Sequence, residues 1–408
     1  MNPTASTARR VLFVDDDSAV LGMLRVIFQR LAGEWDLAFA GGGPEAMELM
    51  RDRAFDLVVS DMRMPGMNGV ELLTEVRERQ PQAARVILSG YADQLLVMQS
   101  LGVAHQFVAK PFDLQMFHAV VRRLVALPAL LGNEHLRVIE SRIQTLPSLP
   151  SLYAQLMEEL ASAEATTDSV GDLIAQDLGL TAKLLQLVNS AFFGVAQSVA
   201  SAREAVQILG FSLVRTLALS IYVFSRFDPA TMPGFPIERL WRHSLATGML
   251  ARRIASKSGL GTDLVEVAFT AGMLHDIGKL ALAFALPDLH RTAMDNAARQ
   301  SIPTHEAEKT VIGSSHAEVG AYLLGLWGLP PEIVDTIAWH HRPREREPVE
   351  LSPLTAVHLA EYIQTRRTPL WDPAPPASVD HEYLELLEMD QQLTKLMSQD
   401  DTAYRVRL

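Results

Sequence analysis

The chain has 408 residues, of which 48% are hydrophobic and 21% charged, and these values predict a globular protein of two or three domains. The net charge of −12 is uneven, because residues 1–125 hold 13 basic and 15 acidic side chains whereas the remainder holds 23 and 33. An acidic C-terminal part argues against a nucleic-acid surface there. The absence of cysteine excludes disulfides, thiolate zinc sites and cysteine nucleophiles.

The N-terminal segment "MNPTASTARR" lacks the apolar core of a signal peptide. No run of apolar residues nears the length of a membrane span. We therefore expect a cytoplasmic protein that binds neither a membrane nor a nucleic acid.

Residues 10 to about 125 alternate short apolar runs with amphipathic patterns. The apolar runs predict strands over 11–14, 55–61, 85–90 and 105–110, and the amphipathic patterns predict helices over 19–31, 69–79 and 113–125. Strands that alternate with helices are typical of a parallel sheet covered by helices on both faces. This part of the chain is therefore predicted to be an α/β domain.

From residue 133 to about 366 the pattern is helix after helix, without a convincing strand. Breaks are expected at 228–236, 328–332 and 341–348, where proline and glycine gather. The stretch "SARE" at 201–204 has the pattern of a capping box before a helix that Gly210 would stop. The final segment is a proline-rich link followed by one more amphipathic helix over 380–397.

Acidic residues follow two of the predicted strands. Asp15, Asp16 and Asp17 come directly after the first, and Asp61 ends the second. Because ligands of doubly wound sheets bind beyond the carboxyl ends of the strands, these carboxylates predict a Mg²⁺ site that can also bind a phosphoryl group. The alternative is that the first three aspartates only cap a helix and the other polar residues lie on the surface.

Four stretches resemble the receiver domain of response regulators: "VLFVDDDSAVL", "FDLVVSDMRMPGMNGVELL", "VILSGYA" and "FVAKPF". The resemblance implies a flavodoxin-like doubly wound parallel sheet of five strands, and a sensor histidine kinase as the partner that supplies phosphate. It also implies the following roles: Asp61 as the phosphoacceptor; Asp15, Asp16, Asp61 and the backbone carbonyl of Arg63 as Mg²⁺ ligands; Ser89, Phe107 and Lys110 as switch residues.

The helical part contains histidines on several separate helices: His243, His275 (beside Asp276), His305, His316, the pair His340 and His341, and His358. A helical bundle can direct such side chains to one internal point, and imidazole with carboxylate suits Fe, Mn or Zn. The alternative is a buried polar network that holds the helices in register. Two further histidines, His105 and His118, lie in the α/β part and have no evident partner in the sequence.

This helical part resembles the HD superfamily, and more narrowly the HDOD domain. The resemblance rests on "LPSLPSL" at 146–152, "LIAQDLGLTAKLLQLVNSAFFG" at 173–194, "AVQILGFSLVRTLAL" at 205–219 and the histidine stretches. It implies an all-α helical bundle that is regulatory rather than catalytic. When the chain is compared with related phosphodiesterases, the resemblance implies metal-ligand positions at His243, His275, Asp276, His316, His340, His341 and Glu361. It also implies Lys279 as a phosphate contact.

Two departures from the phosphodiesterase pattern argue against catalysis. Glu361 stands where an aspartate is expected, and its extra methylene should displace the carboxylate from a preorganised site. The segment after His341 also lacks the Gly-Tyr-Pro turn of those enzymes. The hydrolase scaffold is therefore expected to serve structure or ligand sensing.

These patterns predict a receiver domain over 1–126, a helical linker over 127–145, an HDOD domain over 146–366, and the proline-rich link and helix over 367–408. We expect phosphorylation of Asp61 to change domain contacts or dimerisation, and so to control binding of a protein partner or a small nucleotide ligand. An apolar stripe in the linker suits a seam with the other domain or with a second copy in a homodimer. The alternative function is a phospho-regulated, metal-dependent phosphohydrolase or phosphodiesterase acting on a nucleotide or cyclic dinucleotide.

Overall fold

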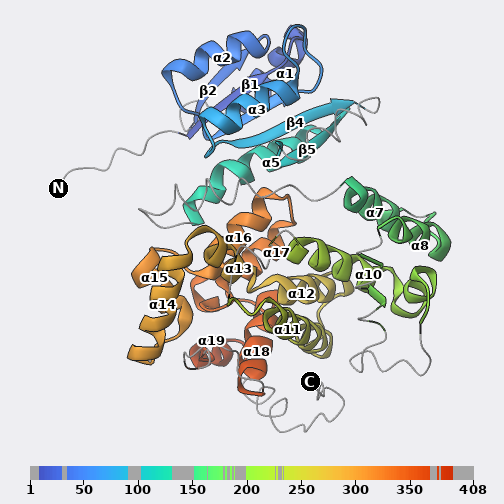
Figure 1. The fold of residues 1–408 in the computed structure, drawn as a ribbon, viewed down its shortest axis with the longest axis vertical. Coiled ribbons are helices and arrows are strands. Elements are labelled where there is room, and N and C mark those ends of the chain that lie inside the picture. The colour runs from blue at the N-terminus through green and yellow to red at the C-terminus, as the bar shows by residue number, and fades with distance from the viewer. Residues whose placement is uncertain are drawn as a thin grey trace. The chain divides into compact units, whose positions relative to one another are not determined.

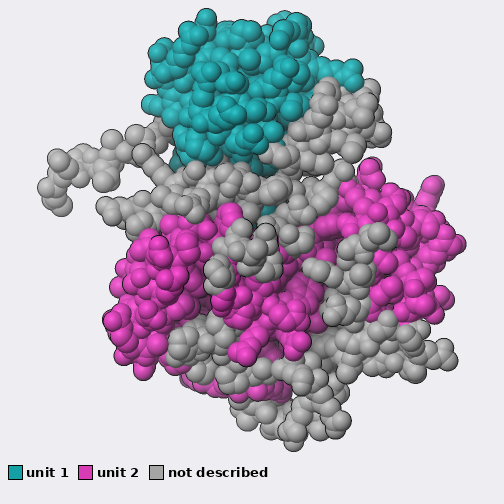
Figure 2. All heavy atoms as spheres, viewed as in Figure 1, with its two compact units in different colours: residues 1–148, 322–330 teal, residues 149–321, 331–408 magenta. Residues whose placement is uncertain are grey.

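The computed structural model divides the chain into two compact units (Figures 1 and 2). The first unit comprises residues 1–148 and 322–330, and the second comprises residues 149–321 and 331–408. The structure describes residues 9–29, 35–90, 103–130, 151–367 with short gaps between 163 and 233, 375, and 378–388. Of the predicted helical linker over 127–145, residues 131–145 lie outside these described residues.

The first unit contains a five-stranded, fully parallel sheet in the order β2-β1-β3-β4-β5. The strands are β1 (Arg9–Val14), β2 (Trp35–Ala40), β3 (Leu57–Asp61), β4 (Ala84–Gly90) and β5 (Gln106–Lys110). The sequence pattern predicts four of these strands and does not predict β2. As an edge strand it is only half-buried along most of its length and carries Asp36, which weakens its apolar signal.

Helices cover both faces of this sheet (Figure 1). They are α1 (Ser18–Phe28), α2 (Gly43–Asp52), α3 (Gly69–Arg79) and α5 (Leu114–Ala126), followed by the 3-10 helix η2 (Leu127–Leu130). On β1, Leu12 and Val14 join the core formed with α2 and α3. Phe13 points to the other face, where its ring lies 5.0 Å from that of Phe28 on α1 and 6.5 Å from that of Phe117 on α5. The predicted α/β architecture is confirmed.

The described residues after 150 form helices and no strand, as predicted. The helices are α7 (Ser151–Ala161), α8 (Thr167–Ala175), α10 (Ala202–Ser225), α11 (Ile237–Lys257), α12 (Thr262–Leu274), α13 (Ile277–Ala285), α14 (Pro287–Gln300), α15 (Thr304–Ile312), α16 (His316–Leu326), α17 (Pro331–Trp339), η4 (Pro343–Glu345, a 3-10 helix), α18 (Pro353–Arg367) and α19 (His381–Leu386).

Glycines allow the central helices of the second unit to approach closely. Gly248 on α11 faces Gly272 on α12, and a Cβ on Gly272 would lie 2.8 Å from the Gly248 Cα. On α13, a Cβ on Gly278 would lie only 1.9 Å from the backbone oxygen of His316 on α16. Larger residues at these positions would separate the helices that carry the predicted metal ligands.

Two predicted helix boundaries have clear physical causes. Ser201 accepts a hydrogen bond from the backbone N–H of Glu204 at 3.2 Å, which starts α10. Gly210 interrupts the helix with a φ of 75° before a second helical stretch continues.

Near the C-terminus, α19 docks on α18 through the buried Tyr383, whose hydroxyl lies 2.7 Å from that of Thr355. The rest of the predicted C-terminal helix lies outside the described residues.

Contrary to the sequence-based expectation, two helical stretches are long and apolar enough to cross a membrane, Ala202–Phe224 and Thr262–Ala285. In an 18-residue apolar window of each stretch, 61% and 89% of the residues are buried. Core helices of globular domains pass the same test of length and composition, so these stretches are weak evidence for a membrane span.

Candidate phosphorylation site and metal centre

Three side chains of the predicted phosphorylation site meet at the carboxyl ends of β1, β3 and β5. The Lys110 ammonium donates to Asp15 Oδ2 at 2.8 Å and also to Asp61 Oδ1. Asp61 Oδ2 accepts a hydrogen bond from the backbone N–H of Arg63 at 2.7 Å. One cation therefore bridges two carboxylates that follow different strands, as the sheet topology requires.

The remaining predicted residues of this site have distinct surroundings. Asp16 is exposed to solvent, whereas Asp17 caps α1 by accepting from the Ala19 backbone N–H at 2.8 Å. The cap interpretation of the aspartates thus holds for Asp17. Ser89 and Phe107 lie in β4 and β5, and their side chains are outside the described residues.

Gly69 sets the distance between the phosphorylation site and α3. A Cβ at this position would lie 2.2 Å from the backbone oxygen of Asp61, and the Gly69 N–H donates to the Met62 oxygen at 2.9 Å. The loop after β3 can therefore fold tightly over the strand end only with glycine here.

Burial and charge act in opposite directions on this site. Burial raises the pKa of Asp15, although the Lys110 hydrogen bond and the Asp17 backbone N–H partly counter it. Burial lowers the pKa of Lys110, but its hydrogen bonds to Asp15 and Asp61 outweigh burial and leave the pKa raised. Lys110 therefore stays charged and can offset a developing negative charge.

His105, for which the sequence offers no partner, is hydrogen-bonded at the opposite end of the sheet. Its Nδ1 accepts from the Arg85 backbone N–H at 3.0 Å, and its Nε2 lies 2.8 Å from the Arg85 guanidinium. Burial, followed by the Arg85 charge, holds the pKa of His105 well below its ordinary value. His118 stacks on Phe28 with ring centroids 5.3 Å apart.

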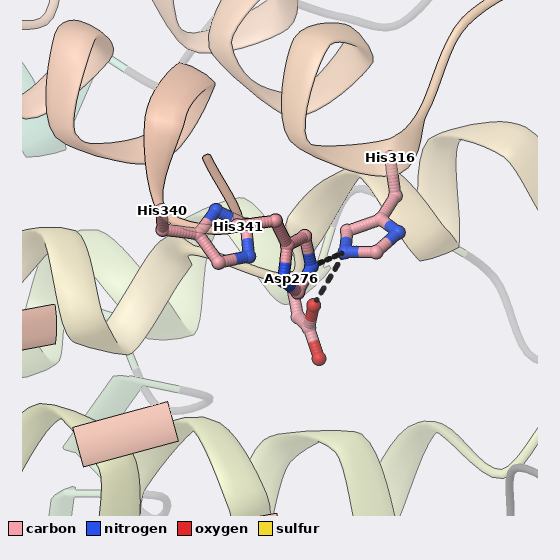
Figure 3. Close-up of side chains that lie close together, drawn as sticks. All are labelled: Asp276, His316, His340 and His341. Carbon is pink, nitrogen blue, oxygen red and sulfur yellow. Dashed lines mark hydrogen bonds and ion pairs between the residues drawn. The ribbon is translucent and has the colours of Figure 1, made fainter. Parts of the chain in front are cut away.

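In the second unit, the helices bring together the seven predicted ligand residues, which we call the histidine centre: His243, His275, Asp276, His316, His340, His341 and Glu361. They form two groups with ligand atoms within 4.8 Å of one another, and both groups contain Asp276. Figure 3 shows the group formed by Asp276 with His316, His340 and His341. The other group comprises His243, His275, Asp276 and Glu361.

The shared Asp276 lies at the junction between α12 and α13. Its Oδ1 is 3.2 Å from His316 Nε2, and its Oδ2 is 3.5 Å from His275 Nε2. Its side chain makes no capping hydrogen bond to α13, although it occupies the N-cap position. The carboxylate is therefore directed into the centre, with one oxygen toward each group.

Backbone carbonyls orient two of the histidine rings. His275 Nδ1 donates to the Gly272 oxygen at 2.8 Å, and His340 Nδ1 donates to the Ile337 oxygen at 2.7 Å. In the neutral ring, this leaves Nε2 unprotonated and directed inward. Ligand histidines of metal sites are commonly held in this way.

The Glu361 carboxylate reaches the centre despite its extra methylene. Its Oε2 lies 2.7 Å from His243 Nε2 and 3.1 Å from His275 Nε2. The side chain comes from α18, which packs closely on α11. The longer side chain thus still places its carboxylate within one ligand group, and the expectation that Glu361 hinders catalysis stays a prediction.

The buried charges of the centre compensate one another. Burial raises the pKa of Asp276, but the charges of Lys279 and His275 overcome it and hold the pKa well below the ordinary value. Burial lowers the pKa of His316, but the charge of Glu308 and the hydrogen bonds of His316 to Asp276 and Glu308 raise this pKa to about 9. Burial, with the neighbouring charge of His275, keeps the pKa of His340 well below its ordinary value.

The donor set fits a transition-metal ion. Among the described residues, the buried His340 Nε2 makes no hydrogen bond, which is costly unless another group binds it. Imidazole nitrogen with carboxylate oxygen suits Fe, Mn or Zn. Each of the two groups offers four such ligands, and they share one carboxylate.

Three more residues predicted or noted from the sequence have other contacts. The Lys279 ammonium donates to Asp276 Oδ2 at 2.8 Å. His305 stacks on His341 with ring centroids 4.2 Å apart. His358 lies between the His340 carbonyl at 2.8 Å and the Asp380 backbone N–H at 3.0 Å, so its role is structural.

Sequence reasoning missed Glu308, which is fully buried and hydrogen-bonded to His316. A weak signal was present, because Glu308 lies four residues after Thr304 and four before Ile312. These residues share the buried face of α15. A glutamate on such a face needs a partner.

Comparisons with known proteins agree with this architecture. The response regulator receiver domain family matches residues 11–122, and the HDOD domain family matches residues 146–343. An uncharacterised protein of Treponema pallidum is 29% identical over 218 residues, which cover 52% of this chain and 41% of that protein. The hydrogenase transcriptional regulatory protein HoxA of Cupriavidus necator is 32% identical over 157 residues, which cover 38% of this chain and 31% of HoxA.

The chain therefore spans less than half of the length of either relative. Among solved structures, an HDOD domain protein of unknown function from Geobacter sulfurreducens is 24% identical, with a TM-score of 0.50. The match covers 72% of this chain and 100% of that chain, and it supports the fold. This chain carries a response regulator receiver domain followed by an HDOD domain of the HD superfamily.

Proposed function

We propose that this protein is a response regulator of a phosphorelay in which phosphorylation of Asp61 controls the HDOD domain. The observation that carries the proposal is the bridge from Lys110 to both Asp15 and Asp61 at the strand ends. A carboxylate beside a fixed cation can accept a phosphoryl group, and the cation then pairs with the added negative charge.

The proposed roles follow from the positions of these residues. An Asp61 oxygen would bond to phosphorus while the bond from phosphorus to the histidine nitrogen of a sensor kinase breaks, which leaves the kinase with a free histidine. Asp15, Asp16, Asp61 and the Arg63 carbonyl would hold Mg²⁺, which neutralises phosphoryl charge when bound. Ser89 and Phe107 would report the phosphorylated state.

Phosphate incorporation from a small phosphodonor such as acetyl phosphate tests this proposal. The full chain should incorporate one phosphoryl group in the presence of Mg²⁺, and Asp61→Asn should incorporate none. Asp52→Asn, at the exposed end of α2, is the matched control and should behave as wild type. Equal labelling of Asp61→Asn and wild type would refute the proposal.

We further propose that the HDOD domain acts by binding a protein partner or a small nucleotide ligand in the cytoplasm, as a monomer or a homodimer. The support is that its buried centre is assembled from many helices, which suits a domain that adopts distinct packed states. Small-angle scattering with and without a phosphoryl mimic tests the control step. Identical curves and identical oligomeric states would contradict it.

A second candidate function is a metal-dependent phosphohydrolase or phosphodiesterase acting on a nucleotide or cyclic dinucleotide. The observation that favours it is the pair of ligand groups sharing Asp276. Metal ions bound there would polarise a phosphoryl group and activate water at neutral pH. Lys279, already directed at Asp276, would contact a substrate phosphate.

Elemental analysis and a hydrolysis assay distinguish this candidate from a binding module. Two equivalents of Fe, Mn or Zn, together with metal-dependent cleavage of a cyclic dinucleotide or a nucleotide, would support the hydrolase. Metal binding without cleavage of either substrate class would favour the binding module.

A further inference from the structure

Glu308 contacts His316, a predicted metal ligand, although Glu308 itself belongs to neither ligand group. It lies on α15, a helix that contributes no residue to the histidine centre. Its side chain is fully buried, at 0% exposure. A carboxylate at such depth is costly unless it accepts strong hydrogen bonds.

Both of its described hydrogen bonds come from His316. Glu308 Oε2 accepts from the His316 backbone N–H at 2.7 Å and from His316 Nδ1 at 2.6 Å. His316 is the first residue of α16, where the backbone N–H has no partner within the helix. One oxygen thus fixes both the helix start and the ring that the helix carries.

The second hydrogen bond determines which ring nitrogen faces the centre. Because Nδ1 donates its proton to Glu308, the nitrogen that can bind a metal is Nε2. Nε2 lies 3.2 Å from Asp276 Oδ1 and 2.9 Å from His341 Nε2, inside the ligand group that Figure 3 shows.

Glu308 differs from the other groups that orient ligand rings. His275 and His340 donate their Nδ1 protons to neutral backbone carbonyls. A charged acceptor makes a stronger hydrogen bond and leaves the opposite ring nitrogen richer in electron density. His316 should therefore be the strongest imidazole donor of its group.

We propose that Glu308 is a positioning residue of the histidine centre that orients His316 and strengthens its bond to a metal ion in the group with Asp276, His340 and His341. The inference rests on the proposed metal centre. Glu308 would act on the ligand group that contains His316 and not on the group with His243, His275 and Glu361.

The test is metal affinity, measured by competition of Zn²⁺ or Mn²⁺ against a chromophoric chelator. In Glu308→Gln the amide oxygen can accept both hydrogen bonds, so the ring stays oriented while the charge is lost. We expect one of the two metal equivalents to bind about 10–100-fold more weakly and the other to be unchanged. Glu308→Ala, which also loses the orientation, should weaken the same equivalent further.

Glu318→Gln is the matched control. This carboxylate lies on the same helix as His316 and pairs with Lys309 at 2.9 Å and Arg342 at 2.8 Å. It also accepts from the Ser315 backbone N–H at 2.8 Å, a hydrogen bond that the amide oxygen of glutamine can keep. Its replacement should leave both affinities at the wild-type value. A Co²⁺-substituted protein adds a spectroscopic readout, because Glu308→Gln should shift the absorption of one ion without lowering Tm.

The outcomes separate this inference from the proposed centre. Wild type without bound metal would overturn both. Wild type with two equivalents, beside Glu308→Gln with unchanged affinities and an unchanged Co²⁺ spectrum, would overturn the role of Glu308 alone.

Discussion

The proposed phosphorylation site and the histidine centre accommodate clustered charge in different ways. The phosphorylation site joins two carboxylates through Lys110, whose side chain is 28% exposed. The histidine centre buries its charges, and the side chains of His275 and Asp276 are both 0% exposed. A site at a strand end can receive a group from another protein, whereas access to a buried centre is restricted.

The two sites also depend on different parts of the fold. The proposed phosphorylation site needs only the carboxyl ends of β1, β3 and β5, which a parallel sheet places at one edge. The histidine centre needs helices far apart in sequence to cross at short distance, which the contacts of Gly248 with Gly272 and of Gly278 with α16 allow. Packing errors should therefore harm the second site more than the first.

The largest expected effect concerns the sharing of Asp276. We expect Asp276→Asn to lose both metal equivalents, whereas His243→Ala and His340→Ala should each lose one, because each belongs to a single ligand group. Elemental analysis of the purified variants measures this. His118→Ala, in the other unit, should keep the wild-type content, and an Asp276→Asn protein that retains one equivalent would show that the groups are independent.

The next effect tests how strictly packing places the centre. Gly278→Ala puts a methyl group 1.9 Å from the His316 oxygen, so the free energy of unfolding of the second unit should fall by about 3 kcal/mol through overpacking. Chemical denaturation measures the change. Gly22→Ala, at an exposed helical position with open space, should raise stability by about 0.5–1 kcal/mol. A tolerated Gly278→Ala would mean that α13 and α16 can separate without loss.

Acid should destabilise the first unit through His105. Its pKa is held well below 6.5 in the folded chain, so below pH 6.5 only the unfolded chain takes up the proton. The stability present above pH 6.5 should therefore be lost as the pH falls, by about 1.4 kcal/mol per pH unit. His105→Gln should remove this part of the slope in denaturation experiments between pH 4 and 7. Parallel slopes for the two proteins would count against it.

The smallest effect separates two adjacent aspartates. Asp17→Ala removes the cap of α1 and should cost about 1 kcal/mol of stability while phosphate incorporation continues. Asp16→Ala should leave stability near the wild-type value but weaken incorporation at limiting Mg²⁺. If Asp17→Ala abolishes incorporation, the cap is not its main role.

The sequence predicts the first site better than the second for a physical reason. The residues of the phosphorylation site follow apolar strands directly, so topology alone places Asp15, Asp61 and Lys110 together. The ligands of the histidine centre come from helices between His243 and Glu361, and only the resemblance to known domains named them as a set. Their mutual distances depend on helix packing.

Features that depend on tertiary contacts could not be predicted. The edge strand β2 is half-buried and gives a weak apolar pattern. Glu308 and His105 each look like an ordinary helix or strand residue until their partners are known. Periodicity can place such a side chain on a buried face, but it does not identify the group that it meets.

His341 is half-buried, whereas the other six residues of the histidine centre are buried, and His305 stacks directly against it. Among the residues that the structure describes, His341 is therefore the most exposed member of the centre, with His305 beside it. Ions or small molecules that enter and leave would pass these two rings, so changes there should alter how quickly the contents exchange more than how tightly they are held.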